Sequence, residues 1–505
     1  MRFKSFAFIL VLAFFLLTIC SMTSFLYPIH NRVDQNCFMT IGKGILKGQV
    51  PYRDLFDQKG PVIFFMHALA SRISTTSFIG VYFLQYVFLI VFMIYTRKTA
   101  CLFVPEKKAN FIVFFTLGLI MTSRCYLRGD NVEEFVLPLI AISMYYMLDM
   151  YLNGERGRLY NLWMMFLNGI FVGFVFWLKF NLLGFWIGFF LFSLVRLIKY
   201  KRFGELIASL LMVLTGFVIV TAPVLLYFHG HNALDDLFYT YFYCNIFLYN
   251  SGSKLLIPVY FVFNTLKNIG QNIVLFPVMV LGIYKFALTS KYLKNRTARR
   301  FLLVTFVISY LGVTFSNVWY DYYLLIVTGF TVFGVIALYD LFEEKYRLKI
   351  VEKIPKLKDV KLMKRTIVIF SLAYVLLFNN CMPYLFRGKL EYPQYKFASI
   401  INKRENATML NYGFVDGGFY FASGIQPEMK FFQTNNITYE EFPEMHDEQT
   451  RIIANKQVDF VVARVKKREK ITDIRCPVLF ENYEIIETAE DIHDRYRYIL
   501  FEKKD

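Results

Sequence analysis

The sequence predicts a mainly α-helical protein that crosses a membrane many times and carries a small α/β domain at its carboxyl end. Three observations support this fold class. Of the 505 residues, 56% are hydrophobic and 19% are charged, and the mean hydropathy is +0.43. Apolar runs of about 18 residues, the length at which a helix spans a bilayer, recur as far as Phe378. After Met382 the composition becomes polar and mixed.

The first apolar run extends from about Phe3 to Leu26. It starts with Arg2 and Lys4, as a signal peptide does, but its core is long and no clear small-residue cleavage site follows. We interpret it as an uncleaved anchor. With the later apolar runs the sequence predicts about eleven transmembrane helices. The later spans are expected at Phe78–Tyr95, Phe111–Ser123, Phe135–Tyr151, Trp163–Trp177, Leu182–Ile198, Leu206–Phe228, Ile273–Leu288, Phe301–Phe315, Tyr322–Leu341 and Thr366–Phe378.

Basic residues predict the orientation of these spans, because cytoplasmic loops are enriched in Lys and Arg. A cytoplasmic amino terminus and an extracytoplasmic carboxyl-terminal domain fit the clusters best. The net charge of +18 belongs largely to these inner loops, so it does not indicate a nucleic-acid partner. The clusters lie at Arg97–Lys98 with Lys107–Lys108, at Arg156 and Arg158, at Lys199–Arg202, at Lys291–Arg300 and from Lys345 to Arg365.

Two apolar segments are too short to span a bilayer. Val62–Ile73 is the clearer case, and Leu255–Thr265 is similar. We expect both to lie as helices at the outer interface. The outer side would then carry the segment from Asp34 to Pro61, Arg124–Glu134, Lys179, His229–Lys254 and Ser316–Asp321.

The polar tail reads as a soluble α/β domain. We therefore predict two domains, a transmembrane domain over residues 1–381 and an extracytoplasmic domain over residues 382–505. Within the tail, the sequence predicts strands at Ala407–Tyr412, Val458–Val465 and Tyr496–Glu502 and a helix at Tyr439–Lys456.

The sequence contains no local signature for a metal, a nucleotide or a serine nucleophile. It has no Cys-x-x-Cys, no Cys/His cluster with zinc spacing, no phosphate-binding Gly-rich loop and no Gly-x-Ser-x-Gly. No metal ligand is predicted. Seven cysteines are scattered through the chain, and one disulfide among Cys37, Cys125 and Cys244 stays open.

Charged side chains gather between the first apolar run and Val62. Asp34 has two interpretations, a helix-capping or solvated carboxylate, or a general base at the lipid–water boundary. The run from Pro51 to Pro61 holds Arg53, Asp54, Asp57 and Lys59. It is either a polar loop that returns to the membrane or a substrate-binding loop in which Lys59 binds a phosphate as a point charge.

Three further candidates lie at predicted outer helix ends. Glu133 could stabilise a helix amino terminus, and Lys179 could extend towards the interface, so each has a structural alternative to substrate binding. Tyr322, within Trp319–Tyr323, fits either an aromatic belt or a sugar-stacking surface. Gly169 and Gly173 form a Gly-x-x-x-Gly helix-packing pattern.

Taken together, these residues resemble the GT-C superfamily of integral-membrane glycosyltransferases. The resemblance is to family 39-like bacterial enzymes, which include relatives of the protein O-mannosyltransferases, the lipid A aminoarabinose transferase and the rhizobial core galacturonosyltransferases. Asp34-Gln35 matches the Asp-Glu pair of the family's first outer loop, with Gln in place of Glu. Phe56–Pro61 resembles a Lys-Pro element before a membrane-parallel helix, and Gly169–Lys179 resembles a Gly-x-x-x-Gly…Lys pattern.

The resemblance implies that Asp34 is the catalytic base and that Lys59 binds the lipid phosphate. It also implies a polyprenyl-phosphate-linked sugar donor, an envelope glycan, lipid or protein acceptor, and no nucleotide at the site. The residues leave a divalent cation open as a cofactor. Two other classes stay open: a transporter or lipid flippase without covalent chemistry, and an assembly protein that keeps the fold without activity. Charges gathered at one face and the lack of repeated halves favour the enzyme.

Overall fold

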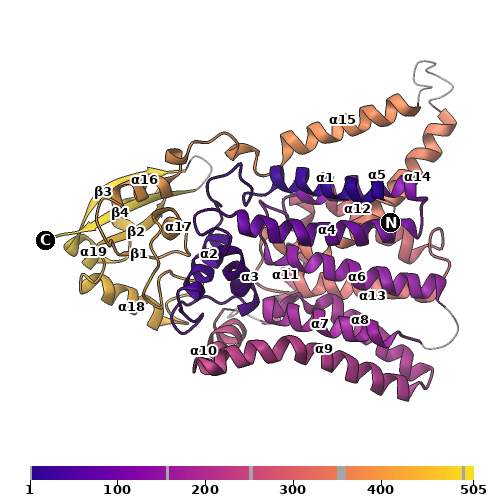
Figure 1. Cartoon of the computed structure of the whole chain (residues 1–505), viewed down its shortest axis with the longest axis horizontal. Helices are drawn as coiled ribbons and strands as arrows, with labels where there is room; N and C mark the ends of the chain where they lie inside the picture. The colour runs from indigo at the N-terminus through magenta and orange to yellow at the C-terminus, as the bar shows by residue number, and fades with distance from the viewer. Residues whose placement is uncertain (1–2, 155–158, 250–253, 350–359, 492–494) are drawn as a thin grey trace. The chain divides into compact units, whose positions relative to one another are not determined.

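The computed structural model describes two compact units, and Figure 1 labels their helices and strands. We call them the helical unit and the mixed unit. The described residues are 3–154, 159–249, 254–349, 360–491 and 495–505. The helical unit comprises Met1–Ser21, Gln85–Ala222 and Ser253–Met382, and the mixed unit comprises Met22–Leu84, Pro223–Gly252 and Pro383–Asp505.

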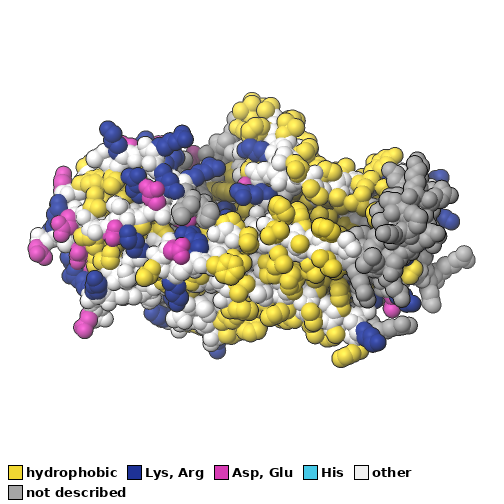
Figure 2. All heavy atoms as spheres, turned by 90° about the horizontal axis from the view of Figure 1, so that it is seen from above, with side chains coloured by type: hydrophobic (Ala, Val, Ile, Leu, Met, Phe, Trp, Pro, Cys, Tyr) yellow, Lys and Arg dark blue, Asp and Glu magenta, His cyan; other side chains and the backbone are white. Residues whose placement is uncertain are grey.

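The helical unit is built from long apolar helices, most of which run in roughly the same direction in Figure 1. On the face that Figure 2 shows, hydrophobic side chains gather over these helices. The start of α4 and the end of α9 are grouped with the mixed unit. The helices are α1 (Phe3–Cys20), α4 (Ile79–Cys101), α5 (Glu106–Thr122), α6 (Val132–Asn153), α7 (Leu162–Lys179), α8 (Gly184–Lys199), α9 (Phe203–Gly230), α11 (Ile257–Gln271), α12 (Leu275–Ile283), α13 (Arg296–Thr314), α14 (Thr331–Lys349) and α15 (Val360–Phe378).

The chain is a multi-pass membrane protein. Among the described residues, seven helices are long and apolar enough to cross a bilayer, or eight with one bent pair. The predicted count of about eleven is not confirmed. One reason is length, because α5 has only 17 residues and the searched apolar part of α15 is Val368–Phe378. The bent pair is α11 with α12, which meet at 114°.

A second reason is that α7 and α8 count as one 38-residue candidate although they are two helices. Trp186 Nε1 donates to Asn168 Oδ1 at 3.0 Å, and Arg196 contacts the Tyr160 hydroxyl at 3.5 Å. These contacts show that α8 folds back along α7, with Lys179 at the break. The predicted packing role of Gly169 is also present, because a Cβ there would clash with the Val213 carbonyl of α9.

The mixed unit contains two short helices from the segment after α1. These are α2 (Val33–Leu46) and α3 (Pro61–Ser71). They pack closely, since a Cβ on Gly42 would lie 2.6 Å from the His67 carbonyl carbon. The predicted interfacial segment Val62–Ile73 therefore forms a short apolar helix, α3, and its placement along the membrane surface stays a prediction.

The sequence did not predict α2, because this segment begins with a polar turn, has no long apolar run and includes Gly42 and Gly44. The predicted outer loop from Asp34 to Pro61 is thus a helix followed by a loop. The predicted short helix at Leu255–Thr265 is also wrong in extent, because it belongs to the longer α11. The basic clusters at Arg156 and Arg158 lie outside the described residues, as does much of the one from Lys345 to Arg365.

The tail forms the predicted α/β fold around a four-stranded sheet of order β1-β2-β4-β3. β1 and β2 are parallel, and the other neighbours are antiparallel. Three strands and the main helix, α18, were predicted, whereas the edge strand β3 was missed. The elements are β1 (Met409–Asn411), β2 (Phe460–Lys466), β3 (Tyr483–Glu490), β4 (Tyr496–Lys503), α16 (Pro393–Ile401), α17 (Phe419–Ser423), α18 (Pro443–Ala454) and α19 (Pro477–Asn482).

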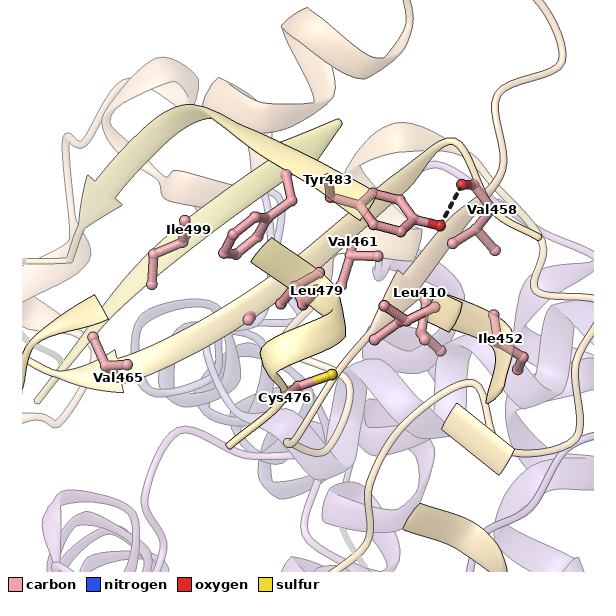
Figure 3. Packing of buried hydrophobic residues seen from close by; sticks show 12 residues of the cluster. Leu410, Ile452, Val458, Val461, Val465, Cys476, Leu479, Tyr483 and Ile499 are labelled. Carbon is pink, nitrogen blue, oxygen red and sulfur yellow. Dashed lines mark hydrogen bonds between the residues drawn. The ribbon is translucent and has the colours of Figure 1, made fainter. Parts of the chain in front are cut away.

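A hydrophobic core holds this sheet together (Figure 3). Val461 and Ile499 from the sheet, Ile452 from α18 and Leu479 from α19 are all at most 2% exposed. The Tyr483 hydroxyl donates to the Val458 carbonyl oxygen at 2.9 Å, which satisfies its polar end inside the core. On the visible face, charged side chains gather over this part of the chain (Figure 2).

The structure shows whether the cysteines are paired. It does not test the predicted domain boundary. All seven cysteines are free thiols, so the disulfide that the sequence left open is absent. The compact unit that contains the tail also contains residues 22–84 and 223–252. The division at residue 382 stays a prediction.

Candidate active site

Asp34, the predicted base, lies in the first turn of α2. A carboxylate at this position is favoured by the helix dipole, so the capping alternative and the catalytic one are compatible. Its side chain is 24% exposed, which leaves it accessible from solvent.

Lys59 lies beside Asp34 in the mixed unit. Its Nζ is 3.5 Å from Asp34 Oδ2 and 5.8 Å from the centroid of the Phe38 ring. Lys59 therefore forms an ion pair with a protein carboxylate. The structure brings together the predicted base and the predicted phosphate ligand from two chain segments. Both are partly exposed, at 21% and 24%, so their mutual attraction adds about 0–1 kcal/mol and leaves both groups available.

Arg53 and Asp54 bind each other. Arg53 Nε and Nη2 donate to the two Asp54 oxygens at 2.9 and 2.8 Å, and the Val50 amide donates to Oδ2 at 2.7 Å. The hydrogen bonds from Arg53 lower the pKa of the Asp54 carboxyl. Arg53 Nη1 also donates to the His231 carbonyl oxygen at 2.8 Å. Their predicted role in substrate binding stays a prediction.

Asp57 is only 2% exposed, unlike its neighbours in the loop. Its Oδ1 accepts from the Lys59 amide at 2.9 Å. Its Oδ2 accepts from Asn435 Nδ2 at 3.0 Å, Gln433 Nε2 at 3.2 Å and the Cys37 thiol at 3.5 Å. Burial raises the pKa of the Cys37 thiol well above its usual value, so this thiol is a hydrogen-bond donor.

Glu133, Lys179 and Tyr322 form a second group, in the helical unit. Lys179 Nζ is 2.7 Å from Glu133 Oε1, and the two side chains are 12% and 1% exposed. The same ammonium lies 5.1 and 4.5 Å from the ring centroids of Tyr322 and Tyr323. Lys179 is thus held by a buried carboxylate and two aromatic rings, and its role in substrate binding stays a prediction.

Sequence reasoning missed a buried polar cluster next to this group. Glu134 accepts hydrogen bonds from Gln85 Nε2 at 2.9 Å, from the Tyr126 hydroxyl at 3.1 Å and from the Asp130 amide at 2.9 Å. Burial raises the pKa of Tyr126 well above its usual value, and the Glu134 carboxylate adds to the effect. No local signal identifies Gln85, which lies inside an apolar run.

No metal centre accompanies these residues in the described ranges, where no three His, Cys, Asp or Glu side chains could hold one ion together. The expectation that left a divalent cation open stays a prediction.

The chain is a multi-pass membrane protein, and it shares its overall fold with a solved membrane protein at low sequence identity, which confirms the predicted fold class of a mainly α-helical, polytopic chain with a small carboxyl-terminal sheet. The likeness is to ArnT from Cupriavidus metallidurans, at 11% identity over 98% of this chain and 97% of that one. The TM-score is 0.63 for its apo structure and 0.61 for its structure bound to undecaprenyl phosphate. An oligosaccharyltransferase from Archaeoglobus fulgidus is more distant, with a TM-score of 0.47 at 12% identity over 90% and 67% of the chains. No family model and no curated protein matches the sequence.

Proposed function

We propose that this chain is an inverting glycosyltransferase. It would move a sugar from a polyprenyl-phosphate carrier to a glycan, lipid or protein acceptor on the outer face of the cell membrane. The observation that carries the proposal is the Asp34–Lys59 pair, a carboxylate and an ammonium 3.5 Å apart and both partly exposed. The shared fold with ArnT, which binds undecaprenyl phosphate, supports a donor of this type.

The two side chains supply what a single displacement requires. Asp34 accepts the proton of the acceptor hydroxyl as its oxygen bonds to the anomeric carbon. The bond between that carbon and the phosphate oxygen breaks, and the phosphate leaves with the electron pair. Lys59 stabilises the negative charge on the leaving group. Attack from the face opposite the phosphate inverts the anomeric configuration.

Deletion of the gene tests the proposal as a whole. We expect polyprenyl-phosphate-linked sugars to accumulate in the deletion strain, because their consumer is absent. Lipid extracts analysed by mass spectrometry would detect them. The wild-type chain should remove the accumulated lipid, and Asp34→Asn should not. An unchanged lipid profile would contradict the proposal.

Lys59→Ala should weaken binding of the donor phosphate. The loss of one charge-assisted contact costs about 1.5–3 kcal/mol, which corresponds to about 10- to 150-fold in affinity. Titration of the purified protein with undecaprenyl phosphate would measure it. Lys47→Ala is the matched control, because Lys47 is an exposed lysine that follows α2. Unchanged affinity in folded Lys59→Ala would reject Lys59 as the phosphate ligand.

The proposal also requires the tail outside the cell and the amino terminus inside. We expect Lys403→Cys, at an exposed position of the tail, to react with a membrane-impermeant maleimide in intact cells. Lys199→Cys, in a predicted inner loop, should react only after permeabilisation. Six of the native cysteines are buried, which keeps the background low. The reverse labelling pattern would overturn the orientation.

A further inference from the structure

Within the mixed unit, two groups of hydrogen bonds, called attachments below, connect the tail to the chain segments that carry Asp34 and Lys59. The first attachment is on α2, which carries Asp34. Thr40 Oγ1 donates to Asp416 Oδ2 at 2.6 Å, and Gln426 Nε2 donates to the Thr40 carbonyl oxygen at 3.3 Å. Asp416 is fully buried, so its hydrogen bonds have no competition from water.

The second attachment is on the loop that carries Lys59. The Phe56 amide donates to the Lys430 carbonyl oxygen at 2.9 Å. Next to it, Asp57 Oδ2 accepts from Gln433 and Asn435, while Asp57 Oδ1 accepts from the amide of Lys59 itself. The Asp57 carboxylate therefore lies between the backbone of Lys59 and the tail.

Gln433 connects the two attachments. Its Nε2 donates to Asp57, and its Oε1 accepts from the Asp416 amide at 2.8 Å. Both Gln433 and Asp416 are 0% exposed. A buried carboxylate such as Asp57 is costly unless donors surround it, which makes this geometry strongly specified. Asp34 and Lys59 belong to different chain segments, so their separation depends on this common support.

We infer that Gln433 and Asn435 are positioning residues for the Asp34–Lys59 pair, and that they act through Asp57. The inference rests on the proposed function and adds a role for the tail in it. Asp57 then orients the Lys59 backbone and does not contact the substrate. Loss of this support lets the loop from Phe56 to Lys59 move relative to α2, so the base and the phosphate ligand lose their relative placement.

Asn435→Ala gives the sharpest test, because the Asn435 side chain donates a single described hydrogen bond. In the full-length protein in nanodiscs, we expect the Phe56 and Lys59 amides to exchange hydrogen faster and the affinity for undecaprenyl phosphate to fall about 10-fold. Gln433→Ala should act in the same direction. Asn436→Ala is the matched control, because this adjacent asparagine is exposed. It should change neither measurement.

Two charge-changing substitutions, at Asn435 and Asp57, distinguish a positioning role of Asn435 from a general loss of stability. Asn435→Asp should weaken binding more than Asn435→Ala, because it places a second carboxylate where an amide nitrogen lies 3.0 Å from Asp57 Oδ2. Adding Asp57→Asn to it removes the repulsion between two buried carboxylates and restores an amide–carboxylate pair, so affinity should recover at least to that of Asn435→Ala, although the new amide nitrogen no longer accepts from Gln433 Nε2. If Asn435→Ala does not fold, this double variant carries the test.

The outcomes distinguish this inference from the proposed function. Faster exchange with unchanged affinity, or no recovery in the folded double variant, would overturn the positioning role. If the wild-type chain does not bind undecaprenyl phosphate, the proposed function fails. The inference is then tested by hydrogen exchange at the Phe56 and Lys59 amides. Exchange rates that return to the wild-type values in the double variant support it. Exchange rates that Asn435→Ala leaves unchanged overturn it.

Discussion

Asp34→Asn should lower turnover by about 10²–10⁴-fold, the usual range for loss of a positioned acid–base group. Asparagine keeps the size of the side chain but cannot accept a proton from the acceptor hydroxyl. The variant also loses its ion pair with Lys59, which is worth at most about 1 kcal/mol at this exposure. Expression and donor binding should therefore stay close to normal. Turnover of a polyprenyl-phosphate sugar, measured beside undecaprenyl phosphate binding, separates the two effects.

Asp54→Asn and Asp57→Asn complete this experiment, because either carboxylate could be the base on sequence spacing alone. The structure distinguishes them, since Asp54 accepts two hydrogen bonds from Arg53 and Asp57 is 2% exposed. If Asp34→Asn retains turnover while one of these abolishes it, the base is misassigned although the enzyme class stands. If all three variants complement a deletion strain, the transporter or assembly alternative replaces the enzyme.

Hydropathy predicted the long helices well because bilayer length imposes a strong pattern on the sequence. It predicted their number poorly, because α5 and the apolar part of α15 are shorter than a full span. The missed elements carry weak patterns. β3 contains three Glu residues and has only one buried side chain, as an edge strand can, so its alternation is lost. α2 contains two glycines and a polar first turn.

The sequence predicted which residues form the candidate site, but not the contacts that hold them in place. Asp34 and Lys59 are near each other in sequence and stood out as charges beside apolar runs. Their supports did not, because Gln433 and Asn435 reach Asp57 across 376 and 378 residues of sequence. Amide side chains in a polar tail resemble ordinary surface residues until the fold buries them. Burial, which gives these hydrogen bonds their strength, is a tertiary property.

The contact between Glu133 and Lys179 was likewise not predicted from the sequence, in which these two charged residues are 46 residues apart. Glu133 is 1% exposed, and its Oε2 has no hydrogen-bond partner among the described residues. Its hydrogen bond to Lys179 therefore compensates most of the cost of burying that carboxylate. A buried pair of this kind adds little net stability as a pair, but the loss of one partner strands the other charge.

Lys179→Met should consequently destabilise the protein by about 3–5 kcal/mol, because it leaves the Glu133 carboxylate buried and unpaired. Adding Glu133→Gln removes the stranded charge and should recover most of this loss. Denaturant unfolding of the detergent-solubilised chain would measure both variants, with the exposed Lys201→Met as the matched lysine control. If Lys179→Met is as stable as wild type, the ion pair with Lys179 does not compensate the cost of burying the Glu133 carboxylate. If Lys179→Met is destabilised but the double variant is no more stable than it, the cost comes from lost packing against Tyr322 and Tyr323. If the double variant regains stability but does not regain affinity for undecaprenyl phosphate, Lys179 also contributes to binding of that ligand.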